Sequence, residues 1–216
     1  MKMLSVLIFV LVFASVMAAP SAKALGQDTA PAADTACLIE LTQPGQVVIG
    51  PEKWNSAADC SGQATVTQSD EGITVIVKVT DDKIWTKSET THRCDSVELY
   101  FDVRPAKSRG GSDYEKGVFQ LVIVPGLGKK PDRMSFHFGS GSHDPQVEGV
   151  KSSSKRLKGK GYQMEIFLPF AGFKRNHFIP TKTFNFDLGI NDADTSETES
   201  QLMWAGTDVN YKDASK

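Results

Sequence analysis

The sequence predicts an all-β fold, an antiparallel β-sandwich of jelly-roll or immunoglobulin-like layout in a single domain. Many short segments alternate apolar and polar residues with a period of two, which is the side-chain period of a strand. Glycine, proline and other turn residues separate these segments at spacings typical of β-sandwiches. No segment of helical period reaches the length of a typical globular helix, and at most 170–176 form one turn after Pro169.

The expected strands begin at residue 38 and follow one another along the chain. They span 38–41, 46–49, 64–68, 73–80, 97–103, 118–124, 134–138, 162–168 and 184–190. Residues 104–114 and 139–161 are long connections rich in glycine, serine and lysine, and binding contacts often lie on such loops. The basic run 151–160 falls inside the second connection, where we expect a solvated loop.

The segment 94–104 is the most informative part of the chain. Its side chains alternate between two faces: Val97, Leu99, Phe101 and Val103 on one, and Ser96, Glu98, Tyr100 and Asp102 on the other. This is the pattern of a strand with one packed face and one face that displays carboxylates. We therefore expect a central strand with its apolar row buried.

The N-terminus has the features of a secretory signal peptide at 1–24. Lys2 is followed by an apolar run over 4–17, and Ala22 and Ala24 supply a small-residue cleavage site, with Ala18 as a second possible point. An uncleaved membrane anchor is the alternative, but the run is short for a bilayer crossing. We expect a secreted protein, extracellular or periplasmic and free of the membrane after cleavage, with a disordered linker over 25–36 and the sandwich over 37–212.

Charge argues against a nucleic-acid partner. The chain has 24 Lys and Arg against 26 Asp and Glu, and loss of Lys2 and Lys23 with the signal peptide leaves 22 against 26, a net charge of −4. A nucleic-acid groove needs a basic surface, and no basic stripe compensates for this balance.

The three cysteines, Cys37, Cys60 and Cys94, fit an oxidising compartment. They allow three pairings with one thiol left over. We favour a Cys60–Cys94 disulfide, because Cys60 follows the first tryptophan-containing turn and Cys94 directly precedes the central strand. None forms a C-x-x-C pair, so a zinc site or a thioredoxin-like motif is not expected.

Three features together resemble carbohydrate-binding module family 9, which is related to the DOMON-like domains. They are the segment 94–104, the strand end at 80–82, and a strand ending over 189–194 shortly before Trp204. The resemblance covers residues 38–210. It implies a secreted, non-catalytic module that binds the end of a polysaccharide or oligosaccharide, with a glycoside hydrolase acting on the same polysaccharide as a possible partner.

The resemblance also assigns roles to the three tryptophans. Trp54 resembles an early tryptophan that packs the family's sandwich, and Trp85 and Trp204 resemble two loop tryptophans that clamp a sugar ring between their faces. An indole face buries the C–H face of a sugar, which makes such a clamp physically reasonable. The alternative is that Trp85 and Trp204 are hydrophobic plugs at the end of the sandwich.

Polar partners of the sugar are expected beside the clamp. The resemblance and the strand pattern point to four residues, Glu98, Asp95, Arg104 and Gln201. A structural ion pair among Arg93, Asp95 and Glu98 is the alternative.

Carboxylates at strand ends suggest a calcium site. The resemblance implies structural Ca²⁺, and Asp81, Asp82, Asp192 and Asp194 supply the hard oxygen ligands that this ion takes. Aspartates are also common in turns, and the glycine-containing loop of an EF-hand is absent. The four histidines have no metal-ligand spacing.

The sequence does not predict an enzyme. Glu98 and Glu165 could pair as in a glycosidase, but no Ser-His-Asp order, G-x-S-x-G, P-loop or GxGxxG motif occurs. Two other functions remain open. One is a DOMON-type haem or redox module with Met134 or Met164 and His137 as axial ligands; the other is a structural surface domain that has lost its sugar pocket.

Overall fold

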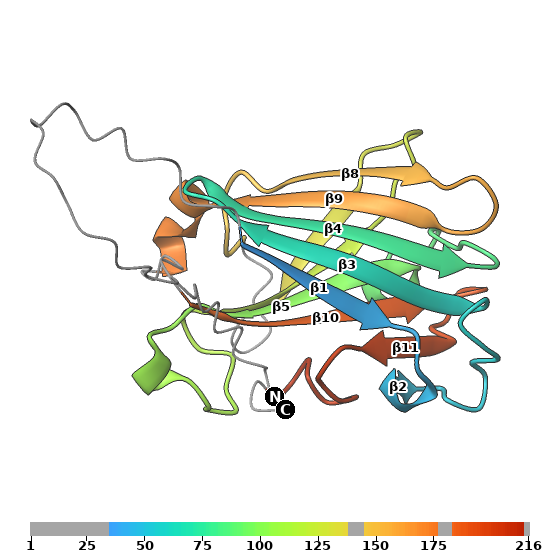
Figure 1. The fold of residues 1–216 in the computed structure, drawn as a ribbon, viewed down its shortest axis with the longest axis horizontal. Coiled ribbons are helices and arrows are strands. Elements are labelled where there is room, and N and C mark those ends of the chain that lie inside the picture. The colour runs from blue at the N-terminus through green and yellow to red at the C-terminus, as the bar shows by residue number, and fades with distance from the viewer. Residues whose placement is uncertain (1–34, 138–144, 177–182, 214–216) are drawn as a thin grey trace, which may run out of the picture.

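The computed structural model describes residues 35–137, 145–176 and 183–213, and these form a two-layer sandwich of antiparallel sheets (Figure 1). The predicted fold class is confirmed. Within these ranges the only helical elements are the 3-10 turns η1 (Pro44–Gln46), η2 (Thr91–Arg93), η3 (Ala106–Ser108) and η4 (Phe170–Asn176). No helix in the described part of the chain is long and apolar enough to cross a membrane. The predicted signal peptide and residues 25–34 of the predicted linker lie outside it.

The first sheet has five strands. In spatial order they are β1 (Thr35–Leu41), β3 (Cys60–Gln68), β4 (Gly72–Asp81), β9 (Tyr162–Pro169) and β8 (Lys151–Arg156). Two expectations are corrected here. Strand β1 begins inside the predicted linker, and β8 lies in the basic run expected to be a loop. Strand β8 pairs with β9 on one side only, and a lysine- and serine-rich sequence is tolerated at such an edge because one side of the strand faces water.

The second sheet has six strands. In spatial order they are β2 (Val47–Ile49), β11 (Ser200–Met203), β10 (Asn185–Asp192), β5 (Ser96–Asp102), β6 (Val118–Val124) and β7 (Arg133–His137). Strand β5 has neighbours on both sides, as predicted for a central strand. Strand β11 was not predicted, because its four residues are too few to show a clear alternation.

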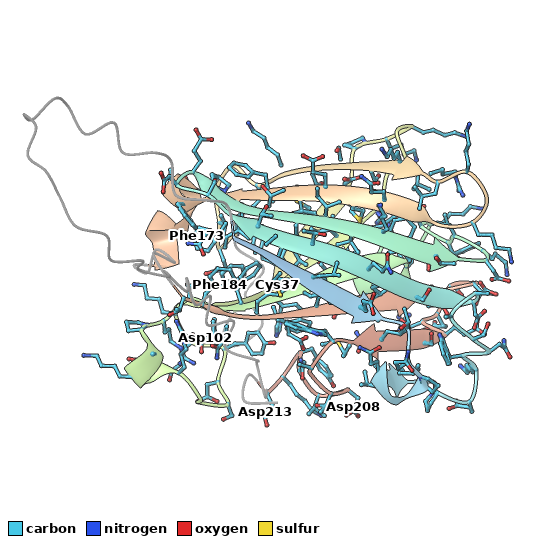
Figure 2. The ribbon with its side chains drawn as sticks, viewed as in Figure 1. Cys37, Asp102, Phe173, Phe184, Asp208 and Asp213 are labelled. Carbon is cyan, nitrogen blue, oxygen red and sulfur yellow. The ribbon has the colours of Figure 1, made fainter. Side chains whose placement is uncertain are left out.

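The core lies between the sheets and is built from the inward-facing rows of the strands. Val97, Leu99 and Phe101 of β5 are fully buried, as predicted. The Phe101 ring packs at 5.1 Å from Phe186 and 5.2 Å from Phe119, measured between ring centroids. Further phenylalanines, among them Phe173 and Phe184, extend the core toward η4 (Figure 2). Each fully buried aromatic ring of this kind contributes about 1.5–3 kcal/mol of transfer free energy.

Trp54 supports the core from one end of the sandwich. Its ring packs against the core, and its indole Nε1 donates a hydrogen bond of 2.7 Å to the carbonyl oxygen of Cys60. This agrees with the prediction that Trp54 is a packing residue.

The predicted Cys60–Cys94 disulfide is wrong for this structure, in which Cys37, Cys60 and Cys94 are all free. Cys60 is part of the hydrophobic core. The thiol of Cys94 instead lies 3.3 Å from the Arg133 guanidinium and 3.5 Å from the carbonyl oxygen of Ser88. The two side chains therefore have different surroundings and do not meet.

Candidate functional site

A pocket of about 780 Å³ lies on the outer face of the six-stranded sheet. Its floor comes from outward-facing residues of neighbouring strands: Glu98 and Tyr100 of β5, Gln120 and Val122 of β6, Ser135 and His137 of β7, Asn191 of β10, and Gln201 of β11. Residues 89–92, which precede β5, add one wall, and Thr207, Asp208, Asn210 and Tyr211 of the C-terminal segment add another. The pocket is therefore built from segments that are far apart in the sequence.

Glu98 is the centre of a buried hydrogen-bond network on this floor. Its Oε2 accepts from the Tyr100 hydroxyl, from Gln120 Nε2 at 2.9 Å and from Gln201 Nε2 at 3.1 Å. Its Oε1 accepts from Asn191 Nδ2 at 2.7 Å. We call these five residues the Glu98 network. Four donors satisfy a carboxylate that is only 2 % exposed, and this offsets the cost of burying it.

The acceptor role of Glu98 also fixes how the three amides are oriented. Both of its oxygens accept hydrogen bonds here, so each neighbouring amide turns its NH₂ group toward Glu98. The second N–H of Gln120 reaches the Tyr100 oxygen at 3.0 Å, and that of Gln201 reaches Asn191 Oδ1 at 2.8 Å. The floor is therefore a preorganised polar surface.

The C-terminal segment forms the rim and is held by a buried carboxylate. Asp187 on β10 accepts hydrogen bonds from the Ala205 backbone N–H at 3.0 Å and from Asn210 Nδ2 at 3.1 Å. Burial raises the pKa of Asp187 to about 6. Beyond this anchor, Tyr211 is half exposed at the mouth of the pocket, with Lys212 Nζ 5.5 Å from its ring centroid.

Two of the sequence-predicted binding residues, Glu98 and Gln201, line the pocket. The other four, Trp85, Trp204, Asp95 and Arg104, do not. Trp204 packs against the core, and its backbone N–H donates to the carbonyl oxygen of Leu188 at 2.9 Å. Trp85 is half-buried beside Asp95, which accepts from its backbone N–H, while its buried indole Nε1 has no hydrogen-bond partner.

Three residues of the Glu98 network were not predicted as binding residues by the sequence analysis. Tyr100 lies two residues after Glu98, so the same alternation that identified Glu98 also identifies Tyr100. Gln120 is the one polar residue in the apolar strand β6 and is only 5 % exposed, and a buried polar residue in such a strand is informative. Asn191 has no comparable signal, because it precedes an aspartate-rich strand end that is also typical of a turn.

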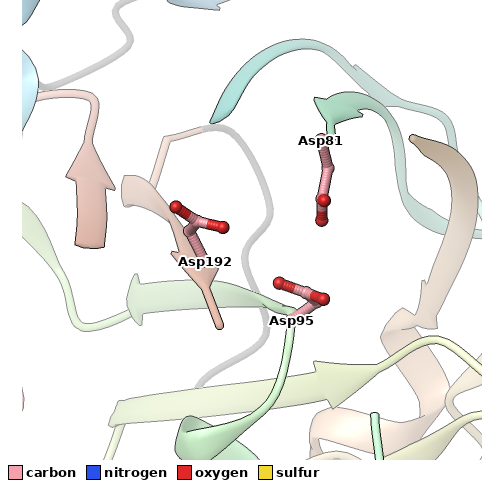
Figure 3. Close-up of side chains that lie close together, drawn as sticks. All are labelled: Asp81, Asp95 and Asp192. Carbon is pink, nitrogen blue, oxygen red and sulfur yellow. The ribbon is translucent and has the colours of Figure 1, made fainter. Parts of the chain in front are cut away.

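A second polar cluster lies at one end of the space between the sheets (Figure 3). Asp81, Asp95 and Asp192 are all buried, and one carboxylate oxygen from each lies within 4.8 Å of the others. Asp81 and Asp192 continue the inward-facing rows of β4 and β10, and Asp95 comes just before β5 in the same alternation as Val97. The cluster therefore caps the core where the apolar rows end.

The electrostatics of this cluster are unfavourable without a cation. Burial raises the pKa of Asp95 to about 9, of Asp192 to about 7 and of Asp81 to about 6, and the nearby charge of Asp81 adds to the effect on the other two. Nearby, the hydroxyl of Tyr162 is buried without a hydrogen-bond partner, and burial together with the charge of Asp95 raises its pKa.

The metal set expected from the sequence is only partly brought together. Asp81 and Asp192 meet, and Asp95 joins them in place of Asp82 and Asp194. Asp82 instead forms a surface ion pair with Lys160 at 3.7 Å, and Asp194 forms one with Lys83 at 3.6 Å.

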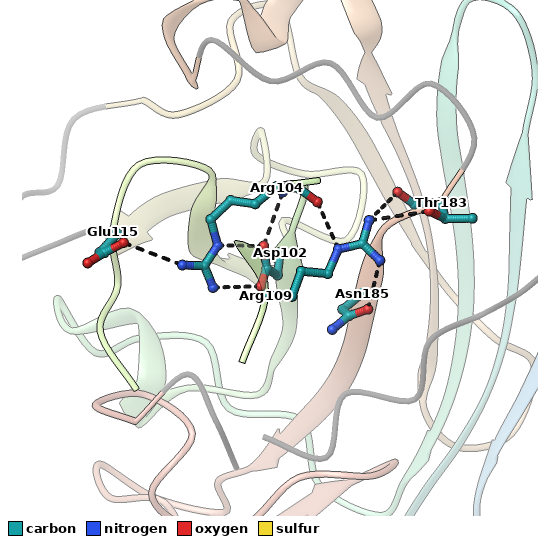
Figure 4. Close-up of polar contacts among 6 residues, drawn as sticks. All are labelled: Asp102, Arg104, Arg109, Glu115, Thr183 and Asn185. Carbon is teal, nitrogen blue, oxygen red and sulfur yellow. Dashed lines mark hydrogen bonds and ion pairs between the residues drawn. The ribbon is translucent and has the colours of Figure 1, made fainter. Parts of the chain in front are cut away.

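Arg104 lies in a different network, where β5 ends (Figure 4). Its guanidinium makes a bidentate contact with Asp102, with Nε at 2.9 Å from Oδ1 and Nη2 at 2.7 Å from Oδ2. Arg109 then donates to the carbonyl oxygens of Arg104 at 2.8 Å and Thr183 at 2.6 Å. This network holds the connection after β5 against the segment that enters β10, so Arg104 has a structural role here.

The predicted alternatives are not assembled either. Arg93 pairs with Glu197 at 3.3 Å rather than with Asp95 or Glu98. Glu165 lies on β9 of the opposite sheet, so it cannot form a glycosidase pair with Glu98.

The axial ligands proposed for haem also lie apart. Met164 is sealed in the core, whereas His137 lines the outer pocket. Met134 is three residues before His137 on the same strand, so the two side chains point to opposite faces.

Comparisons with known proteins agree with the fold. Residues 42–216 match the profile of the family described as "Carbohydrate family 9 binding domain-like". No curated protein matches the sequence.

Two similar solved structures are of a carbohydrate binding module family 9 from Caldicellulosiruptor kristjanssonii. The one in complex with cellotriose has a TM-score of 0.55 at 12% identity, covering 79% of this chain and 77% of that one. The one in complex with glucose has a TM-score of 0.57 at 13% identity, covering 82% and 80%. At such low identity, these likenesses show the shared fold.

Proposed function

Because the chain belongs to the carbohydrate family 9 binding domain-like family, we propose that it binds the end of an oligosaccharide or polysaccharide in the outer pocket of the six-stranded sheet. The family is one of non-catalytic binding modules, as expected from the sequence. The observation that carries the proposal is the Glu98 network, a rigid polar floor beneath a pocket of about 780 Å³.

The chemistry of the pocket suits a sugar. Its volume falls within the roughly 300–1,000 Å³ usual for small-ligand sites. Sugar hydroxyls need fixed hydrogen-bond partners, which the floor offers, and Tyr211 at the mouth offers an aromatic face for C–H groups. The walls that residues 89–92 and the C-terminal segment add to the floor favour a chain end over the middle of a long polymer.

Calorimetric titration with neutral oligosaccharides such as cellotriose tests the proposal. Gln201→Ala and Tyr211→Ala should weaken binding, because both residues line the pocket. Glu165→Gln is the matched control, since Glu165 is exposed on the other sheet. Absence of saturable binding, or equal loss in the control, would refute the pocket as the site.

The two-tryptophan clamp stays a separate prediction. Neither Trp85 nor Trp204 lines the pocket, so the pocket proposal expects Trp85→Ala to leave sugar affinity unchanged. The clamp hypothesis instead predicts that Trp85→Ala weakens sugar binding. The Trp85 variant therefore decides between the two sites, and Trp204→Ala is less informative because Trp204 also packs on the core.

We also propose that Asp81, Asp95 and Asp192 hold a structural Ca²⁺. The residues fit this ion: their donors are all oxygens, as Ca²⁺ prefers, and three buried carboxylates converge within 4.8 Å. No lysine or arginine of the described residues forms an ion pair with them, and the unpartnered hydroxyl of Tyr162 lies close by. A bound divalent cation would offset their mutual repulsion and stabilise this end of the sandwich.

Export and a partner enzyme complete the proposal. The leader pattern over 4–24 supports secretion, and a secreted sugar-binding module is useful beside a glycoside hydrolase acting on the same polysaccharide. N-terminal sequencing of protein recovered from the medium tests the first point, with cleavage after Ala24 or Ala18 as the expected result.

A further inference from the structure

We infer that the pocket selects a sugar that carries a protonated amine, such as a 2-amino-2-deoxy sugar at a chain end, over neutral and acidic sugars. This rests on the proposed function and names the ligand class of the same site. Two observations carry it: how the hydrogen-bond donors of the floor are used, and the charge of the residues around the pocket.

The donors of the Glu98 network are already engaged. Both N–H groups of Gln120 are used, on Glu98 and on the Tyr100 oxygen. Both N–H groups of Gln201 are used on Glu98 and Asn191, and both of Asn191 are used on Glu98 and Ser96. The Tyr100 hydroxyl donates to Glu98 as well. These four side chains therefore have no donor left for a ligand.

What remains on the floor is acceptor capacity. The Oε1 atoms of Gln120 and Gln201 accept no hydrogen bond from the described residues, and Oε1 of Glu98 accepts only one. A ligand group that meets the Glu98 network, rather than Ser135 or His137 beside it, must donate. An ammonium group carries three donors and no acceptor, whereas a hydroxyl does both and a carboxylate at neutral pH only accepts. The floor thus fits an ammonium best and a carboxylate worst.

The charge around the pocket points the same way. Three carboxylates line it, those of Glu98, Glu89 and Asp208, together with the imidazoles of His92 and His137. No lysine or arginine of the described residues lines it, although Lys212 lies against Tyr211 at the mouth. An excess of acidic groups in a cleft favours cationic ligands over anionic ones. Acidic sugars such as uronates would meet both repulsion and a shortage of donors.

Calorimetric titration of the full chain with four trisaccharides tests the inference. The ligands are the glucosamine trimer, its N-acetylated form, cellotriose and the galacturonate trimer, at about pH 6, below the pKa of ordinary amino groups. We expect the glucosamine trimer to bind at least about tenfold more tightly than cellotriose, because hydrogen bonds between charged partners are about twice as strong as neutral ones. Acetylation should remove this preference, and galacturonate should bind weakest.

Rim variants separate charge recognition from a general effect. Glu89→Gln with Asp208→Asn should reduce glucosamine affinity about threefold to tenfold, reduce cellotriose affinity by a smaller factor, and make the remaining glucosamine affinity less sensitive to salt. Asp70→Asn with Glu71→Gln is the matched control, because it removes the same two charges from the exposed turn between β3 and β4.

The outcomes are distinct. If cellotriose or galacturonate binds as tightly as the glucosamine trimer or more tightly, the amine preference is wrong but the proposed sugar-binding function stands. The same conclusion follows if the rim variant weakens cellotriose binding as strongly as glucosamine binding. Binding of none of the four sugars would refute the proposed function and this inference together.

Discussion

The metal-free protein should lose stability as the pH rises, because of the Asp81, Asp95 and Asp192 cluster. Without a cation, the pKa values of these carboxyls are about 6, 9 and 7 in the folded protein, because they are buried together. In the unfolded chain they titrate near about 3.9. Above about pH 4, the folded state therefore holds protons that the unfolded chain has released.

The size of the effect follows from linkage. Each such proton lowers the free energy of unfolding by about 1.4 kcal/mol per pH unit. The stabilisation is fully present below the unfolded pKa of about 3.9. It is lost as the pH rises through about 6 for Asp81, about 7 for Asp192 and about 9 for Asp95. Saturating Ca²⁺ at about a hundred times its dissociation constant adds about 2.7 kcal/mol, or roughly 5–10 °C in Tm for a domain of this size.

Thermal unfolding followed by tryptophan fluorescence measures this, with EGTA or Ca²⁺, at about pH 5 and about pH 8. Asp95→Asn should abolish the calcium response. Without metal it should stabilise the protein at the higher pH, because the buried Asp95 carboxyl must take up a proton there on folding and an asparagine need not. Asp82→Asn and Asp194→Asn are matched controls, because these acids pair with surface lysines instead. The reasoning fails if the metal-free protein gains stability between the two pH values, or if the control variants lose the calcium response while Asp95→Asn keeps it.

Three further predictions concern the core, the Arg104 network and the rim. Leu99→Ala should lower the free energy of unfolding, measured in urea, by about 2–5 kcal/mol because of the cavity it leaves. The control Leu38→Ala changes a residue that is 69% exposed and should alter this free energy by less than about 0.5 kcal/mol. Similar values for the two variants would place Leu99 outside the core. Arg104→Ala should lower the free energy of unfolding by about 3–5 kcal/mol in the same assay, because it leaves the Asp102 carboxylate buried and unpaired. An unchanged free energy of unfolding would show that Asp102 is not buried in this way. Tyr211→Ala should remove about 1–3 kcal/mol of sugar affinity with an unchanged Tm, and a falling Tm would instead indicate a packing role.

The fold was predictable wherever burial imposes a period of two. The strand over 97–103 shows this most clearly, because three consecutive inward positions are fully buried and none tolerates a polar residue. The strand β11 was missed because its four residues are too few to show an alternation. The edge strand β8 was missed because its residues are largely exposed and have no need to alternate. Their place is set by pairing with β10 and β9, which the local sequence does not encode.

Only some of the pocket residues could be predicted from the sequence, for a related reason. Glu98 and Gln201 stood out as polar residues near a recognised strand, but the pocket exists because β6, β5, β10 and β11 lie side by side in an order that differs from their order in the sequence. Gln120 and Asn191 become partners of Glu98 only through that long-range pairing.

The alternation also explains which aspartates form the cluster. Asp82 follows Asp81 directly, and adjacent residues of a strand point to opposite faces, so Asp82 faces away from the core and pairs with a lysine. Asp95 precedes Val97 by two residues and shares its inward direction, which brings it to the cluster rather than to the sugar pocket. Counting in steps of two from the buried row would have assigned Asp81 and Asp95 to the inner face and Asp82 to the outer one.

The same alternation means that one pairing register of β10 and β11 positions both the pocket residues and the aspartate cluster. On β10, Asn191 faces the pocket and the next residue, Asp192, faces the cluster. On β11, the Ser200 hydroxyl donates to Asp192 at 2.9 Å, and the next residue, Gln201, donates to Glu98. A shift of one residue along either strand would exchange these roles, sending carboxylates into the pocket and amides into the interior. The apolar row of Leu188 and Ile190 prevents such a shift, because it would expose both side chains to water. The buried core of this sheet therefore fixes the positions of both polar sites at once.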